Sequence, residues 1–186
     1  LEYPLSGRAD GRPAMPSAGA IHPYEALVLA HGDRLVRVDA ARRVCRVLPA
    51  DPRWCSAVRD RGLTDHGEHG AHVILLVRPW LSMRKYGLRG HDYGQLDTAH
   101  LAAAVLGAAL SQGAEATLRT GLPRAELRGL LGPAARFREL HSVVSIRSGP
   151  TFDPTDRWAW HLAEEAAPRP PVGEPAGRPS LISELE

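Results

Sequence analysis

Two short segments hold the residues whose types and spacing could support chemistry. Residues 12–25 read RPAMPSAGAIHPYE, and residues 84–93 read RKYGLRGHDY. Small residues in the first segment would let a bound molecule approach the backbone closely. A lysine serves as a general base where burial or a neighbouring cation lowers its pKa. Arg84 and Arg89 are the cations nearest to Lys85 in the second segment. The first segment therefore suits a loop that a ligand can approach, and the second places a lysine close in sequence to two cations that could lower its pKa.

The elements that must position these segments follow from the apolar pattern. Runs of aliphatic and β-branched residues predict strands at residues 24–31, 35–38, 44–48, 71–77, 116–119 and 139–147. A Gly-Asp pair at residues 32–33 predicts a hairpin turn between the first two strands. Apolar residues at helical spacing predict helices at residues 51–61, 92–112 and 124–131.

The helix at residues 92–112 is the longest predicted element, and no proline interrupts it. At ~1.5 Å per residue it would be about 30 Å long, which is the width of a small domain. We therefore expect a central, buried helix. Strands and helices do not alternate in regular βαβ units, which favours an α+β fold with a mixed sheet around this helix over a doubly wound fold.

The length and composition are those of a soluble protein with one globular domain. Of 186 residues, 44% are hydrophobic and 24% are charged, and the net charge is +2. Charges of both signs are interspersed, so neither nucleic acid nor an anionic membrane is indicated as a partner. No apolar run approaches the roughly 20 residues of a membrane span, and residues 1–12 lack a signal-peptide pattern. Cys45 and Cys55 form no paired motif, which favours a reducing, cytoplasmic setting.

The composition changes after Gly149. We expect residues 1–149 to form the domain. Residues 150–186 are rich in Gly and Pro and would form a C-terminal arm that is partly extended or disordered. Trp158 and Trp160 would anchor this arm by packing.

Several other chemistries are disfavoured. No GxGxxG or GxxxxGK[ST] loop occurs, which argues against the common nucleotide-binding folds. His66, His69 and His72 are spaced suggestively for a metal, but the glycines between them disfavour the helix that would align them, so no metal site is predicted. His100 lies within the long apolar helix and is expected to be a hydrogen-bonded core histidine rather than a catalyst.

The two segments together resemble the blocks PSAGA-x-x-P-x-E and KYG-x-RG-x-x-Y of SagB-type dehydrogenases, which are nitroreductase relatives that act on azoline rings. The resemblance covers about residues 12–149. It implies a nitroreductase-like fold, FMN as the cofactor and a dimer with the flavin at the subunit interface. The implied reaction oxidises thiazoline or oxazoline rings to thiazole or oxazole in a ribosomally made peptide.

The resemblance also implies roles for individual residues. Lys85 and Tyr86 match the family's catalytic pair. Oxidation of an azoline removes one ring hydrogen as a proton and one as a hydride to the flavin, so a base must stand beside the ring. Tyr86 would orient the substrate or relay the proton, and oxygen would accept the electrons of the reduced flavin. The implied cofactor-binding residues are Arg12, Pro16, Ser17, Ala18, Gly19, Arg84 and Arg89.

The arginines that would bind the flavin phosphate bear on whether a partner subunit is needed. The family grips it with an arginine-rich N-terminal helix and with an arginine after the last strand, whereas here residues 1–11 offer Arg8 alone and residues 148–151 offer none. We therefore expect a second, different biosynthetic subunit to complete the site, with a homodimer as the alternative. Two other functions stay open: a reductase that uses NAD(P)H, and a non-catalytic subunit that stabilises a flavin-dependent partner.

Overall fold

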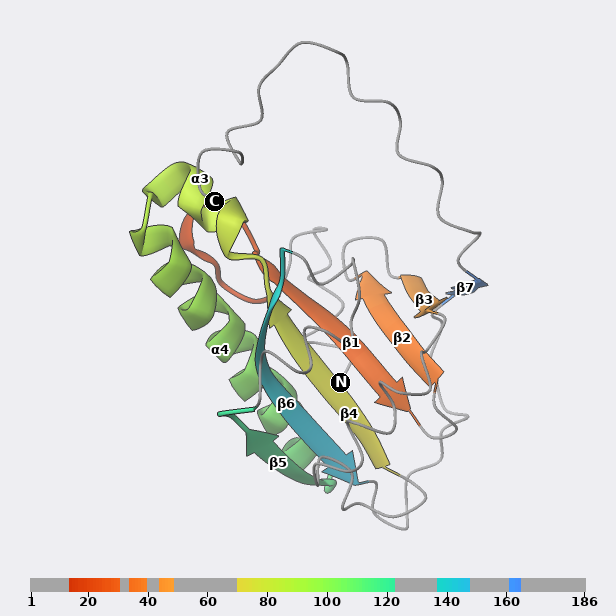
Figure 1. Ribbon diagram of the computed structural model, residues 1–186. Coiled ribbons are helices and arrows are strands. Elements are labelled where there is room, and N and C mark those ends of the chain that lie inside the picture. Colours follow the sequence, from red (N-terminus) through yellow and green to blue (C-terminus); the bar gives the residue numbers. More distant parts are fainter. Residues whose placement is uncertain are drawn as a thin grey trace.

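One twisted sheet and a helical layer on one of its faces make up the fold of the computed structural model (Figure 1). The structure describes residues 14–30, 34–39, 44–48, 70–122, 137–147 and 161–164. Within these residues the sheet has seven strands in the order β5-β6-β4-β1-β2-β3-β7. Their bounds are β1 Tyr24–Ala30, β2 Arg34–Asp39, β3 Val44–Leu48, β4 Gly70–Val77, β5 Glu115–Arg119, β6 Glu139–Arg147 and β7 His161–Glu164.

The sheet is mixed, as the sequence predicts. Strands β1 to β6 pair in antiparallel fashion, and β7 pairs with β3 in parallel. The six strands expected from the apolar runs are confirmed, with ends that differ by one residue at most. Strand β4 lies between β1 and β6, and residues 72–77 of it are buried. This confirms the expectation that the run AHVILLV is a central strand.

Both faces of the central strands are apolar, and each face has its own core. On the helical side, Val73 and Leu75 of β4 pack with Leu101 and Val105. On the other side, Ile74 and Leu76 alternate with them and pack against apolar residues of β1, β2 and β6. Successive side chains of a strand point to opposite faces, so a continuous apolar run in β4 serves both cores.

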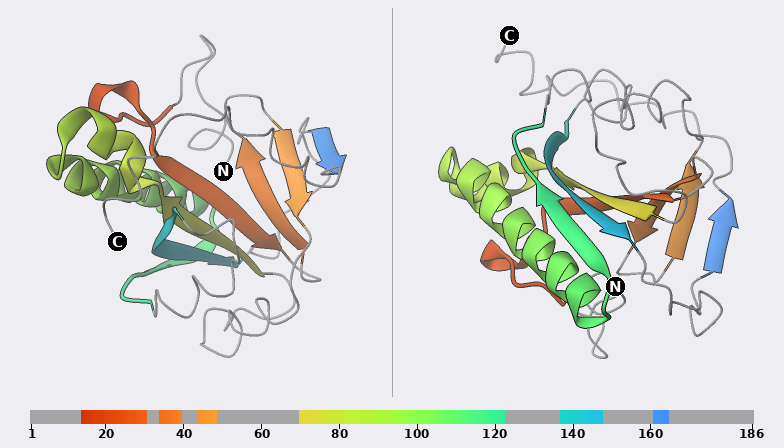
Figure 2. Two further views of the ribbon diagram at one scale, coloured as in Figure 1. Left: turned by 45° about the horizontal axis from the view of Figure 1, so that its top comes forward. Right: turned by 90° about the horizontal axis from the view of Figure 1, so that it is seen from below.

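The helical layer consists of α3 (Pro79–Tyr86) and α4 (Arg89–Ser111). Helix α4 lies across β5, β6, β4 and β1 (Figure 2). It begins three residues before the expected start at Asp92, so Arg89 belongs to it. Helix α3 was not expected, although Pro79 at its first turn is typical of a helix start. None of the described helices is both long and apolar enough to cross a membrane.

Helix α4 is buried along one face only. Thr98, Leu101 and Val105 face the sheet, whereas Leu96 and Leu110 are 58% and 53% exposed. His100 is exposed. The expectation that His100 is a core histidine is therefore wrong, because the buried face of the helix is set by Leu101 and its neighbours one turn apart.

Several predictions lie outside the described residues. These are the helices at residues 51–61 and 124–131, the turn at residues 32–33 and most of the arm at residues 150–186. Strand β7 is the described part of that arm, and it extends the sheet beyond β3. His72 is buried and shares a hydrogen bond of 2.9 Å with Ser145. Across the described ranges, no group of three or more His, Cys, Asp or Glu residues could hold a metal ion.

Candidate functional site

The loop that leads into β1 has an unusual backbone. It contains the short 3-10 helix η1 (Ala18–Ala20). Gly19, Ala20 and His22 adopt φ angles of 61°, 56° and 50°. A left-handed conformation costs a non-glycine residue about 1–2 kcal/mol. Such residues persist where surrounding contacts determine the backbone, and they concentrate at functional sites.

Those contacts come from Asp97 on α4, whose carboxylate is only 5% exposed. The hydroxyl of Ser17 donates to Asp97 Oδ2 at 2.5 Å, and the N–H of Ala18 donates to both carboxylate oxygens at 3.2 Å. Ser17 Oγ in turn accepts the N–H of His22 at 2.8 Å. Hydrogen bonds to a charged group contribute about 1.5–3 kcal/mol each, enough to offset the strain in the loop. The hydroxyl of Ser17 therefore serves the conformation of the loop itself.

The same loop lies against the Lys-Tyr pair at the end of α3. A Cβ atom added to Gly19 would lie 2.5 Å from Lys85 Nζ and would also overlap Tyr86 Oη. The positive φ favours glycine there, and a side chain at this position would also have to displace the ends of Lys85 and Tyr86. The structure thus brings Gly19, Lys85 and Tyr86 together, although the loop and the pair are far apart in the sequence.

Lys85 is also distinctive in the composition. The sequence has 23 lysine and arginine residues, and Lys85 is the only lysine among them. Arginine stays protonated in proteins, whereas a lysine amine can lose its proton and act as a base. Its Nζ lies 5.3 Å from the centre of the Tyr86 ring, and that ring packs edge-on against Tyr93 with centroids 5.1 Å apart.

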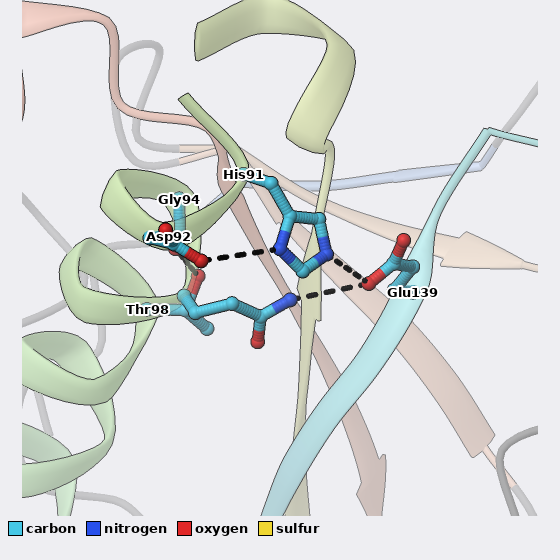
Figure 3. Close-up of polar contacts among 6 residues, drawn as sticks. His91, Asp92, Gly94, Thr98 and Glu139 are labelled. Atoms are coloured by element: carbon cyan, nitrogen blue, oxygen red, sulfur yellow. Dashed lines mark hydrogen bonds and ion pairs between the residues drawn. The ribbon is translucent and has the colours of Figure 1, made fainter. Parts of the chain in front are cut away.

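Close packing between the two helices fixes the position of α3. A Cβ atom at Gly90 would overlap the backbone of Ser82 and Met83, so the helices approach each other more closely than larger residues would allow. At the same end of α4, His91 Nε2 lies 3.2 Å from Glu139 Oε2, and the side chain of Gln95 donates to the same oxygen at 3.1 Å (Figure 3). These contacts join the start of α4 to the start of β6, so the helical layer that carries Lys85 is tied to the sheet.

Two titratable residues of the loop were not identified from the sequence. His22 Nδ1 and Tyr24 Oη share a hydrogen bond of 2.9 Å. Burial lowers the pKa of His22, and the nearby Asp97 carboxylate opposes this shift. Burial, assisted by Asp97, raises the pKa of Tyr24 to about 12. Both side chains are therefore uncharged near neutral pH.

Patterns in the sequence could have identified these residues. His22 and Tyr24 lie two positions apart at the entry to a strand, on one face. Asp97 is four residues before the buried Leu101, on the apolar face of the long helix. A lone carboxylate on the buried face of a helix requires hydrogen-bond donors from elsewhere in the chain.

Opposite the helical layer, the start of β1 is held by charged residues. Arg78 Nη2 donates to the carbonyl oxygens of His22 and Tyr24, each at 3.4 Å. Burial lowers the pKa of Arg78, and Glu25 opposes this shift. The Glu25 side chain is 8% exposed and pairs with Arg37 at 2.7 Å and Arg138 at 2.5 Å.

The other predicted cofactor residues differ in their exposure. Pro16, Arg84 and Arg89 are exposed, as is Lys85, and Ala18 is half-buried. Arg12 lies outside the described residues. The structure therefore brings the loop, Lys85 and Tyr86 together, and Arg84 and Arg89 make no described contact with this loop.

Comparisons with known proteins give structural neighbours. No protein-family model matches the sequence, and no curated protein is significantly similar to it. A candidate nitroreductase from Anabaena variabilis is 20% identical, with a TM-score of 0.60 over 71% of this chain and 28% of that one. The E. coli microcin synthetase McbBCD complex with truncated pro-MccB17 bound contains a chain that is 12% identical, with a TM-score of 0.66 over 79% of this chain and 60% of that one.

A candidate nitroreductase from Ralstonia eutropha is 14% identical, with a TM-score of 0.62 over 81% of this chain and 71% of that one. The chain thus spans less than two thirds of the length of the first two neighbours. At these identities the likeness establishes the architecture. The chain has a nitroreductase-like α+β fold, built from a mixed sheet and one long helix.

Proposed function

We propose that this chain is an FMN-dependent oxidoreductase that converts thiazoline or oxazoline rings of a ribosomally made peptide into thiazole or oxazole. The observation that supports this most directly is the contact of Gly19 with Lys85 and Tyr86. The predicted flavin loop and the predicted base, which come from two separate sequence blocks, thereby share one site.

The loop suits a flat ring system. Pro16, Gly19 and Ala20 are exposed, and none has a side chain that would keep a planar ligand away from the backbone. Residues 16–20 would hold FMN on this surface, close to Lys85 and Tyr86. When bound, FMN supplies the acceptor for the two electrons and the hydrogen that leave the ring as hydride.

Lys85 is the proposed base. Conversion of an azoline to an azole removes two hydrogens from the ring, and the one that leaves as a proton passes to Lys85 Nζ. Tyr86 Oη lies on the same side of Gly19 and orients the ring through its hydroxyl. Molecular oxygen is the final electron acceptor.

A partner subunit is the second part of the proposal. Leu96, Ala99, His100, Ala103, Gly107 and Leu110 form the exposed outer face of α4. Apart from His100 this face is apolar, and it has small residues at its centre, so a second helix can approach it closely. We propose that it binds another biosynthetic subunit of the peptide-modifying assembly, with a homodimer as the alternative. The neighbour McbBCD is itself a complex with a peptide precursor bound.

The test uses the purified full chain. FMN titration, followed by flavin fluorescence, measures whether the chain binds the cofactor. Incubation in air with a synthetic thiazoline peptide then reports azole formation as the loss of two hydrogens by mass spectrometry. Binding of FMN together with azole formation supports the proposal. FMN binding with NAD(P)H consumption and no azole indicates a reductase. Absence of FMN binding, both alone and with a candidate partner, contradicts a role for this chain in flavin chemistry.

A further inference from the structure

We propose that Asp97 is the positioning residue of this site. Its buried carboxylate holds the loop from Ser17 to His22 against α3, and it thereby sets where the amine of Lys85 and the hydroxyl of Tyr86 stand relative to a bound ring. The catalytic meaning of this role rests on the proposed function. The positioning itself can be measured without cofactor or substrate.

The first argument is the origin of the contacts. Asp97 belongs to α4, Lys85 and Tyr86 belong to α3, and the two helices are packed backbone to backbone at Gly90. Asp97 and the Lys-Tyr pair are therefore parts of one rigid layer. The loop is the separate piece, and the Asp97 carboxylate receives its Ser17 hydroxyl and its Ala18 N–H. Loss of these contacts would let the loop move relative to Lys85.

The second argument is that one anchor controls the whole loop. Ser17 Oγ donates to Asp97 and accepts the N–H of His22, so it links the two ends of the turn. The left-handed residues Gly19 and Ala20 lie between these ends. Because the left-handed conformation of Ala20 is unfavourable without such links, loss of the carboxylate should release Gly19 from its contact with Lys85.

The third argument is that the arrangement requires a carboxylate. The two donors of the loop, the Ser17 hydroxyl and the Ala18 N–H, both bind Asp97, whose carboxylate oxygens are acceptors only. An amide at this position has one acceptor oxygen and would direct its own NH₂ at one of the two donors. Asn is nearly the same size as Asp, so Asp97→Asn removes this pairing with little change in volume.

The experiment uses the unique lysine as a reporter. Biosynthetic labelling with ¹³C,¹⁵N-lysine places a single labelled side chain in the full chain, at Lys85. The variants are Asp97→Asn and Ser17→Ala, and the matched control is Asp92→Asn. Asp92 is also on α4, but it is exposed. Among the described residues its side chain contacts His91 alone, at 3.7 Å. The expected result is that both loop variants shift or broaden the Lys85 Cε and Nζ signals, while Asp92→Asn leaves them at their wild-type positions.

The outcomes separate this proposal from the proposed function. Wild-type Lys85 signals in a folded Asp97→Asn chain would overturn the positioning role. A shift in Asp97→Asn with no shift in Ser17→Ala would also overturn it, because the link from Asp97 through Ser17 to His22 would then not hold the loop. If Asp97→Asn does not fold, the Lys85 signals of Ser17→Ala test the proposal: a shift supports it, and wild-type signals overturn it. If the wild type binds FMN, both loop variants should bind it about tenfold more weakly. If the wild type binds no FMN, either alone or with a candidate partner, the proposed function fails and the NMR result still stands.

Discussion

A Cβ atom at Gly19 would lie 2.5 Å from the amine nitrogen of Lys85, so the backbone of the loop and the tip of α3 are in direct contact. Gly19→Ala should therefore displace Lys85 and Tyr86 and add the strain of an alanine at a φ of 61°. We expect a loss of about 1–3 kcal/mol in unfolding free energy and weaker FMN binding.

Gly113→Ala is the matched control for this variant. Gly113 also has a positive φ, of 75°, but a Cβ atom there would meet nothing within 4 Å. Gly113→Ala therefore measures the cost of placing alanine at a positive φ, about 1 kcal/mol, without the displacement of neighbouring side chains. Denaturant unfolding and FMN titration measure both variants. Equal stability losses and equal FMN affinities in the two variants would contradict the contact of Gly19 with the Lys-Tyr pair.

Lys85→Arg separates a base from a simple cation. Arginine keeps the positive charge but does not give up its proton in proteins, so it cannot accept one from the substrate. Azole formation should fall by about 10²-fold or more, while FMN binding stays close to the wild-type level. The reverse exchange at the exposed end of β6, Arg147→Lys, should leave the rate unchanged. A near wild-type rate in Lys85→Arg would show that Lys85 acts through its charge.

Glu25→Gln tests the charged cluster beneath the start of β1. The Glu25 carboxylate is 8% exposed and pairs with Arg37 and Arg138. Its removal would leave two partly buried guanidinium groups without this counter-charge, next to Arg78. Breaking a buried pair costs about 3–5 kcal/mol, and we expect a loss of this size in unfolding free energy.

Glu115→Gln is the control for this prediction. Glu115 pairs with Arg147, but both side chains are largely exposed, at 69% and 49%. An exposed pair contributes about 0–1 kcal/mol. Chemical denaturation of both variants gives the comparison, and similar losses would mean that burial of the Glu25 cluster has little energetic weight.

The strands and the long helix could be predicted because their apolar patterns are local. Val73 to Val77 form a continuous apolar run whatever the rest of the chain does, and the Ala-Leu pattern of α4 is equally self-contained. Helix α3 could not be identified in this way. Its sequence PWLSMRKY covers only about two turns, too few for a helical period to stand out, and its place depends on the contact of Gly90 with Ser82 and Met83.

The site was predicted only in part, for a related reason. The motif blocks pointed to Gly19, Lys85 and Tyr86, and the structure brings these three together. Asp97 was not identified, because its role depends on donors 79 and 80 residues earlier in the chain. His100 was expected in the core because the composition of a helix does not fix its rotation, which packing against the sheet decides.

The last prediction concerns pH and depends on His22. Burial lowers the pKa of His22 below its ordinary value of 6.5, and the carboxylate of Asp97 opposes this only in part. Between the two pKa values the unfolded chain binds a proton that the folded chain does not bind. The contribution of His22 to stability is therefore fully present above pH 6.5 and is lost as the pH falls below it.

His22→Asn tests this dependence with little backbone strain, because asparagine is one of the few non-glycine residues that tolerate a φ near the 50° found at this position. The unfolding free energy is measured by denaturant at about pH 7.5 and about pH 5.5, on either side of the ordinary histidine pKa. The loss on acidification should be smaller in His22→Asn than in the wild type. His100→Asn removes an exposed histidine of α4 and should keep the wild-type loss. An unchanged loss in His22→Asn would mean that protonation of His22 does not oppose folding, and that the loop admits the charged imidazole beside Tyr24.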